Sequence, residues 1–81
     1  MKIAVEISYY PLSEHYNQII HDFITRLATH QEIDLRPGAM SSIIVGRYED
    51  IFQVLHEEVR EFMEKYPAVL HLKIANSCPV E

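Results

Sequence analysis

The chain has 81 residues, a hydrophobic fraction of 48% and a formal net charge of −5. This length predicts one domain, residues 1–81, and the hydrophobic fraction argues against a disordered chain. The acidic balance argues against nucleic acid as a partner, because phosphate binding needs a basic surface, and it suits a cationic small molecule better.

No apolar run approaches the ~20 residues that a bilayer-spanning helix needs. Cys78 is the only cysteine, so no intrachain disulfide can form. We expect a cytoplasmic protein with no membrane insertion.

The first predicted elements are a strand at residues 2–10 and a helix at residues 13–30. Along the strand, alternate side chains face opposite ways. The set expected beneath helices is Ile3, Val5 and Ile7, and the opposite set is Ala4, Glu6, Ser8 and Tyr10. Pro11 ends the strand, and Ser13 is expected to cap the helix. The apolar positions with helical spacing are Tyr16, Ile20, Phe23, Ile24 and Leu27.

A short polar strand at residues 32–36 and a longer apolar strand at 39–45 follow. Pro37-Gly38 between them fits a type II turn, in which Gly38 has a positive φ. The stretch 40–46 is apolar on both faces, with Met40 and Ile44 on one side and Ile43 and Val45 on the other. A strand of this kind is covered on both faces. Since one helical layer covers only one face, we expect a partner subunit, a ligand or both on the other.

The second helix is predicted at residues 48–65 and the last strand at residues 68–75. Acidic residues near the start of the helix and Lys65 at its end suit the helix dipole. The expected buried stripe is Ile51, Leu55, Val59, Phe62 and Met63, and the glutamates expected in solvent are Glu57, Glu58, Glu61 and Glu64. On the last strand, the residues expected beneath the helices are Leu70, Leu72 and Ile74, and those facing away are Val69, His71, Lys73 and Ala75.

The element order β-α-β-β-α-β predicts an α+β, ferredoxin-like sandwich. Right-handed crossovers place both helices on one face of a four-stranded antiparallel sheet ordered 4-1-3-2. The first and third strands lie at its centre, and this pair is expected to be the exception that runs parallel. The helix-free face then combines apolar side chains from the third strand with charged ones from the first and fourth.

Ser41 and Ser42 are the first candidate functional residues. Because they are adjacent in a strand, their hydroxyls point to opposite faces. They can be structural serines satisfied by neighbours, or one of them can contact a ligand. A catalytic nucleophile is disfavoured, because no G-x-S-x-G context is present and activation needs a nearby base.

Glu6 is the second candidate, because a carboxylate in a central strand is costly to bury without a partner. Lys73 or His71 on the neighbouring strand can supply that partner, or Glu6 can be reserved for a cationic or amino-bearing ligand. The histidines lack the spacing of metal ligands, and we predict no metal site. His15 is of interest because it follows the exit of the first strand and lies near Tyr10. Cys78 is expected to be buried or to line a pocket rather than to react.

Four segments together resemble a known family: 7–16 (ISYYPLSEHY), 40–46 (MSSIIVG), 50–52 (DIF) and 76–79 (NSCP). They are similar, in order and spacing, to the YkoF-like family of thiamine- and hydroxymethylpyrimidine-binding proteins. The resemblance implies a ferredoxin-like fold, binding of thiamine or its hydroxymethylpyrimidine moiety without catalysis or a further cofactor, and assembly through sheets as a homodimer or homotetramer. The matching positions that it implicates in ligand binding are Tyr10, Ser41, Ser42 and Cys78, together with His15. The family favours Ser-Thr at the hydroxyl pair, whereas this chain has Ser-Ser.

Two other classes of function remain open at this point. A dimeric ferredoxin-like enzyme, of an isomerase or oxygenase type, would need a convergent acid–base pair, and Glu6 with His71 is the candidate. A structural oligomerisation module would fill its helix-free face with a partner and leave no cavity for a ligand.

Overall fold

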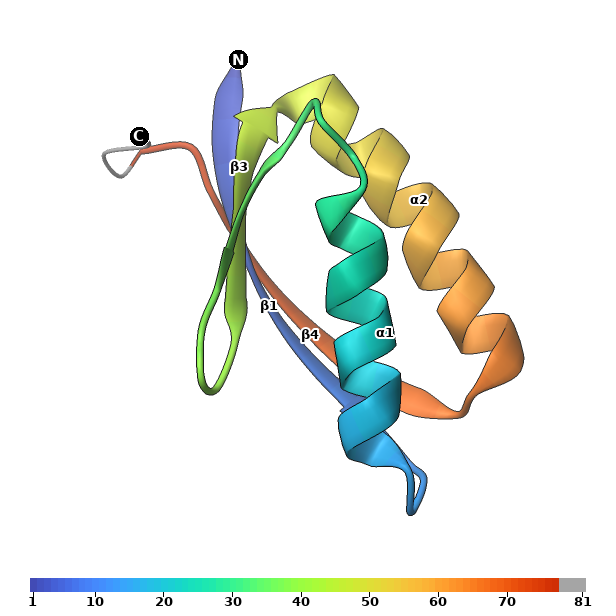
Figure 1. Ribbon diagram of the computed structural model, residues 1–81. Helices are drawn as coiled ribbons and strands as arrows, with labels where there is room; N and C mark the ends of the chain where they lie inside the picture. The colour runs from blue at the N-terminus through green and yellow to red at the C-terminus, as the bar shows by residue number, and fades with distance from the viewer. Residues whose placement is uncertain (78–81) are drawn as a thin grey trace.

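The computed structural model describes residues 1–77 and has the predicted ferredoxin-like architecture (Figure 1). The elements, in chain order, are β1 (Lys2–Pro11), α1 (Tyr16–Ala28), β2 (Asp34–Pro37), β3 (Ser42–Arg47), α2 (Tyr48–Lys65) and β4 (Ala68–Ala75). Both helices lie on the same side of the sheet (Figure 1). Among residues 1–77 no helix lies on the other side of the sheet, so the α+β prediction with one helical layer is confirmed.

The four strands are ordered β2-β3-β1-β4, as predicted. One expectation about their directions is wrong, because β1 and β3 run antiparallel, with Ile3 opposite Gly46 and Ile7 opposite Ser42. The reason is topological. Helix α1 carries the chain back along the sheet, so β2 runs in the same direction as β1. The turn after β2 then reverses the chain. As a result β3, which lies between β2 and β1, runs opposite to both. Every described pair in the sheet is therefore antiparallel.

The core lies between the sheet and the two helices and is centred on β1. Ile3, Val5, Ile7 and Tyr9 are all buried, whereas the residues between them are not. Tyr9 packs against Phe23 of α1 with 4.5 Å between ring centroids. Phe23 in turn meets Phe62 of α2 edge-on at 5.2 Å. One strand and both helices are thus joined by three aromatic rings, in tilted and edge-to-face geometries that add to the energy of burial.

Element boundaries near the pocket described below differ from the predictions. Helix α1 begins at Tyr16 rather than Ser13, because the Ser13 hydroxyl accepts a hydrogen bond from the His15 amide and forms a turn there. Strands β2 and β3 begin two and three residues later than expected, and Met40 lies outside β3 and is exposed. Gly38 does not have a positive φ, so the type II turn is wrong. Glycine is needed there for a different reason: a Cβ would lie 2.5 Å from the Ser41 carbonyl oxygen.

Helix α2 has the predicted bounds, but one of its glutamates lies on the unexpected side. Glu58 is only 4% exposed, whereas Met63, which was expected to be buried, is 44% exposed. The spacing carried a signal for this, since Glu58 lies three residues after Leu55 and four before Phe62 and so continues their buried face.

Glu58 is stabilised by two cationic or hydrogen-bonding partners from the end of α1. Its carboxylate lies 2.5 Å from His30 Nε2 and 3.3 Å from Arg26 Nε. Arg26 also contacts Glu61 at 2.9 Å. Because a buried carboxylate is tolerated only when paired and hydrogen-bonded, this cluster links the C-terminal end of α1 to the middle of α2.

Replacement of His30 by alanine should therefore destabilise the fold, by about 1–3 kcal/mol, because a buried carboxylate loses a hydrogen-bond partner. Chemical denaturation of the two proteins measures the difference. His21 on the exposed side of α1 is the control, and His21→Ala should stay within about 0.5 kcal/mol of the parent. Equal stability of the His30 and His21 variants would contradict the role given to this cluster.

Candidate functional site

A small cavity lies between the sheet, α1 and the loop that joins β2 to β3. Its volume is about 140 Å³. The sheet contributes Ile7, Tyr9 and Ser42, α1 contributes apolar side chains, and the loop contributes residues 38–41. The complete lining is Ile7, Tyr9, Ile20, Phe23, Ile24, Pro37, Gly38, Ala39, Met40, Ser41 and Ser42. The cavity is thus mainly apolar, and three of its lining residues, Tyr9, Ser41 and Ser42, carry a hydroxyl group.

The structure separates the two adjacent serines as the strand pattern requires. Ser42 lies opposite Ile7 on the helix side of the sheet and is 5% exposed. Ser41 is directed toward the helix-free side, where its hydroxyl donates a hydrogen bond to Glu6 Oε2 at 3.0 Å. Both residues reach the cavity, Ser42 from the sheet and Ser41 from the loop. Ser42 is therefore the serine that belongs to the helix–sheet layer.

Tyr9 is a cavity residue that the sequence reasoning did not single out. It is 9% exposed, and its hydroxyl has no hydrogen-bond partner among residues 1–77. Burial raises the pKa of the Tyr9 phenol, and the nearby Tyr66 raises it further. The sequence did contain a signal for Tyr9. It lies an even number of residues from Ile3, Val5 and Ile7 in the strand, so its side chain faces the helices as theirs do.

Glu6 lies on the helix-free face, between two partners. Besides Ser41, it contacts Lys73 Nζ at 3.7 Å across the β1–β4 ladder. Since the Lys73 side chain is 73% exposed and the Glu6 side chain 42% exposed, this ion pair contributes little to stability. His71, the other suggested partner, lies opposite Ser8 instead. The arrangement is that of a cross-sheet ion pair with an added serine hydroxyl.

The remaining candidate residues lie away from the cavity or outside the described part of the chain. Tyr10 is 53% exposed on the helix-free face, one residue beyond the buried Tyr9. His15 is exposed at the start of α1. Cys78 lies outside the residues that the structure describes. Of the six candidates, the structure brings Ser41 and Ser42 together at the cavity and Glu6 next to Ser41.

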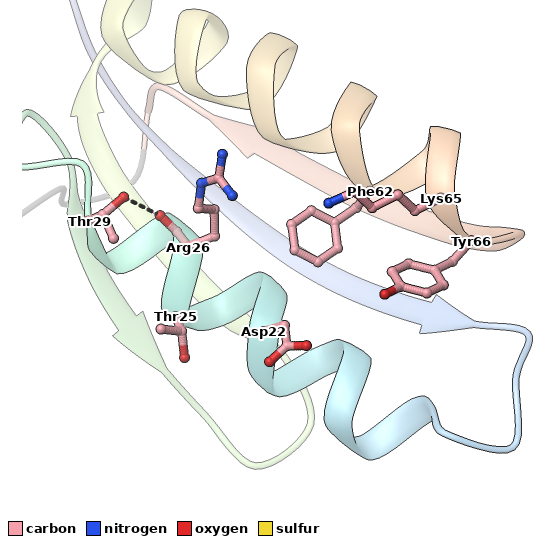
Figure 2. A pocket seen from close by; sticks show the side chains of 7 residues that line it. All are labelled: Asp22, Thr25, Arg26, Thr29, Phe62, Lys65 and Tyr66. Atoms are coloured by element: carbon pink, nitrogen blue, oxygen red, sulfur yellow. Dashed lines mark hydrogen bonds between the residues drawn. The ribbon is translucent and has the colours of Figure 1, made fainter.

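A second hollow lies between the helices, on the side away from the sheet (Figure 2). Asp22, Thr25, Arg26 and Thr29 approach it from α1, and Phe62, Lys65 and Tyr66 from α2 and its end. Its two cations already contact Glu61, Arg26 at 2.9 Å and Lys65 at 3.9 Å. This hollow is therefore a surface groove with largely compensated charge.

Within residues 1–77, neither helix is long and apolar enough to cross a membrane. The same part of the chain holds no cluster of three His, Cys, Asp or Glu side chains that could bind a metal ion.

Comparison with known proteins gives matches among solved structures. No family model and no curated protein matches the sequence. A protein from Thermotoga maritima, named as a candidate thiamine biosynthesis or salvage protein, is 21% identical with a TM-score of 0.83, over 95% of this chain and 85% of its own. A protein from Streptococcus pneumoniae whose name states no function is 19% identical with a TM-score of 0.85, over 95% and 88%. A domain of unknown function from Bacillus cereus is 12% identical with a TM-score of 0.74, over 94% and 76%.

These likenesses establish the fold of the chain as that of small ferredoxin-like proteins. At such identities they do not single out the YkoF-like family among them, and that narrower resemblance stays a prediction.

The buried Tyr9 phenol should make stability fall at alkaline pH. Because burial holds the folded-state pKa above the unfolded value of about 10, the unfolded chain loses its proton first. The contribution to stability is complete below the unfolded pKa and is lost as the pH rises from that value through the higher folded-state pKa. Tyr9→Phe should abolish this part of the alkaline loss, whereas Tyr10→Phe, at the exposed neighbour, should retain it. Urea denaturation from neutral pH to above pH 10 measures both, and identical profiles would contradict the assignment.

Proposed function

We propose that this protein binds thiamine or its hydroxymethylpyrimidine moiety and does not catalyse a reaction on it. The observation that carries the proposal is the cavity beside Ser42, which combines apolar walls with hydroxyl groups. Ligand sites commonly have this composition, with a few polar groups that fix orientation. The shared fold with a Thermotoga maritima protein named for thiamine biosynthesis or salvage supports the choice of ligand.

The volume of the cavity suits one aromatic ring. At about 140 Å³ it is close to the size of an apolar cavity that binds benzene, roughly 150 Å³. It is smaller than the roughly 300–1,000 Å³ usual for drug-sized ligands. The pyrimidine ring is therefore the part that we place inside, and the thiazolium ring of thiamine would extend outward past the β2–β3 loop.

The polar groups match the edge of an aminopyrimidine. A serine hydroxyl both donates and accepts, so Ser42 can serve either a ring nitrogen or the exocyclic amino group. The Tyr9 hydroxyl is buried without a partner among the described residues, and a ligand with a ring acceptor would satisfy it. Each such hydrogen bond contributes about 0.5–1.5 kcal/mol net.

The surroundings of the cavity suit the positive charge of thiamine. The chain has a net charge of −5, which favours approach of a cation. Glu6 lies one hydrogen bond away from the cavity residue Ser41. We propose that this carboxylate reads the cationic or amino-bearing side of the ligand, in a cytoplasmic role in thiamine transport, salvage or sensing.

The helix-free face is the surface on which we propose that two copies meet through their sheets, as a homodimer or within a homotetramer. It exposes three large apolar or aromatic side chains, Tyr10 (53%), Ile43 (39%) and Val69 (54%). If two copies meet in this way, Glu6 and Ser41 would lie at the contact between the two sheets.

Isothermal titration with hydroxymethylpyrimidine and with thiamine tests the ligand. We expect saturable binding of both, and comparable affinity would show that the pyrimidine ring supplies most of the contact. No heat and no shift in melting temperature with either compound would reject the proposal.

Ser42→Ala should weaken binding about 2–10-fold, in proportion to one lost neutral hydrogen bond, without lowering the melting temperature by more than a few degrees. Ser41→Ala should weaken thiamine binding through the loss of the contact with Glu6. Ser8→Ala, on the same strand as Glu6 but away from the cavity, is the control. If all three variants bind like the parent protein, the serines do not line the binding site.

A further inference from the structure

The two edges of the sheet are protected to very different degrees. β2 has four residues, carries an Asp34–Arg36 ion pair at 2.9 Å and ends at Pro37. Short length, charge and proline are devices that prevent an edge from pairing with another strand. β4 has eight residues, contains no proline and keeps an unbroken register with β1 from Ala68 to Ala75. Its outer side therefore offers a long and regular row of backbone hydrogen-bonding groups.

An apolar groove runs along this open edge, on the helix side. It has a volume of about 450 Å³ and is lined by Phe52, Leu55, His56, Val59, Leu70 and Leu72. Phe52 is 37% exposed, and Ile74, farther along β4, is 47% exposed. An open strand edge and an exposed apolar groove are separate features, and here they occupy the same border of the molecule.

We propose that a second copy of this chain docks at this border, with its own β4 antiparallel to the first, so that the two sheets become one. The sequence of β4 is complementary to itself about a two-fold axis through Leu72. On the helix side, Leu72 meets Leu72 of the second copy and Leu70 meets its Ile74. On the other side, Val69 meets Ala75, and His71 meets Lys73, whose ammonium can donate to an unprotonated imidazole. A two-fold contact of this kind uses the same patch on both copies.

Charge favours a second copy over a basic peptide at this border. The chain is acidic overall, yet neither β4 nor the lining of the groove contains an acidic side chain. Two copies can thus meet here without bringing carboxylates together, whereas a basic strand would face His71, Lys73 and His56. Because β2 is protected, the assembly closes at two copies along the sheet instead of continuing as a fibre.

This interface is independent of the proposed ligand. The groove borders β4 and α2, whereas the cavity borders β3, α1 and the β2–β3 loop. It also differs from the helix-free face, so the two contacts together would build a tetramer from pairs.

Sedimentation of the full chain over a wide range of concentrations tests the proposal. The parent protein should associate, and Phe52→Lys with Ile74→Lys should halve the mass of the assembly or weaken its association at least about tenfold. Met63→Lys, at a residue of α2 that is 44% exposed and outside the groove, is the matched control and should leave the mass unchanged. Thermal melting followed by circular dichroism checks that each variant is folded. If the double variant is not folded, the single variant Phe52→Lys is used in its place.

Two results would overturn the inference. One is a parent protein that sediments as a monomer at every concentration. The other is an assembly that survives the Phe52 and Ile74 changes but is lost on Ile43→Lys, which would assign the contact to the helix-free face alone. Hydrogen exchange gives a second measurement, because β4 amides should be protected in the assembly and should exchange faster in the edge variants while β1 amides do not.

Discussion

The alternation of β1 is the constraint on which the rest of this structure depends. Four of its side chains are buried beneath the helices, and the residues between them remain on the open face. A shift of the β1 register by one residue would exchange the buried and the open-face side chains and would place Glu6 in the core. Since β1 has neighbours on both sides, its register also fixes which residues of β3 and β4 face the helices. The register of β1 therefore determines where the cavity, the ion pair at Glu6 and the exposed edge at β4 lie.

The same periodicity explains how much of the fold the sequence predicted. The order of the strands, the helical layer, the bounds of α2 and the inward faces of β1 and β4 all follow from period-two or helical spacing, which is a local property. The direction of β3 relative to β1 is not local. It depends on how many times the chain reverses direction between the two strands. The expectation of a parallel pair was wrong because it did not include the reversal between β2 and β3. Turn geometry failed for a related reason, because the close approach of Gly38 to Ser41 depends on where the whole loop lies.

The candidate site was only partly accessible from the sequence. Alternation showed that Ser41 and Ser42 diverge, and the fold decides which of them enters the helix–sheet layer. Tyr9 was overlooked in favour of its neighbour Tyr10, although its parity indicated burial. Glu58 was assigned to solvent because charged side chains usually lie there. Its actual position depends on Arg26 and His30, which are 32 and 28 residues away in the chain, and no periodicity encodes such a pairing.

The Glu58 cluster has a mechanical consequence for the cavity. It holds α1 at its C-terminal end, through Arg26 and His30, whereas the N-terminal end has no side-chain cap. Phe23, in the middle of α1, is fully buried against Tyr9 and Phe62, so the cluster and the aromatic contacts together fix the position of the helix. Ile20, Phe23 and Ile24 form the helical wall of the cavity. A change at Glu58, which does not line the cavity, would therefore reach that wall through α1.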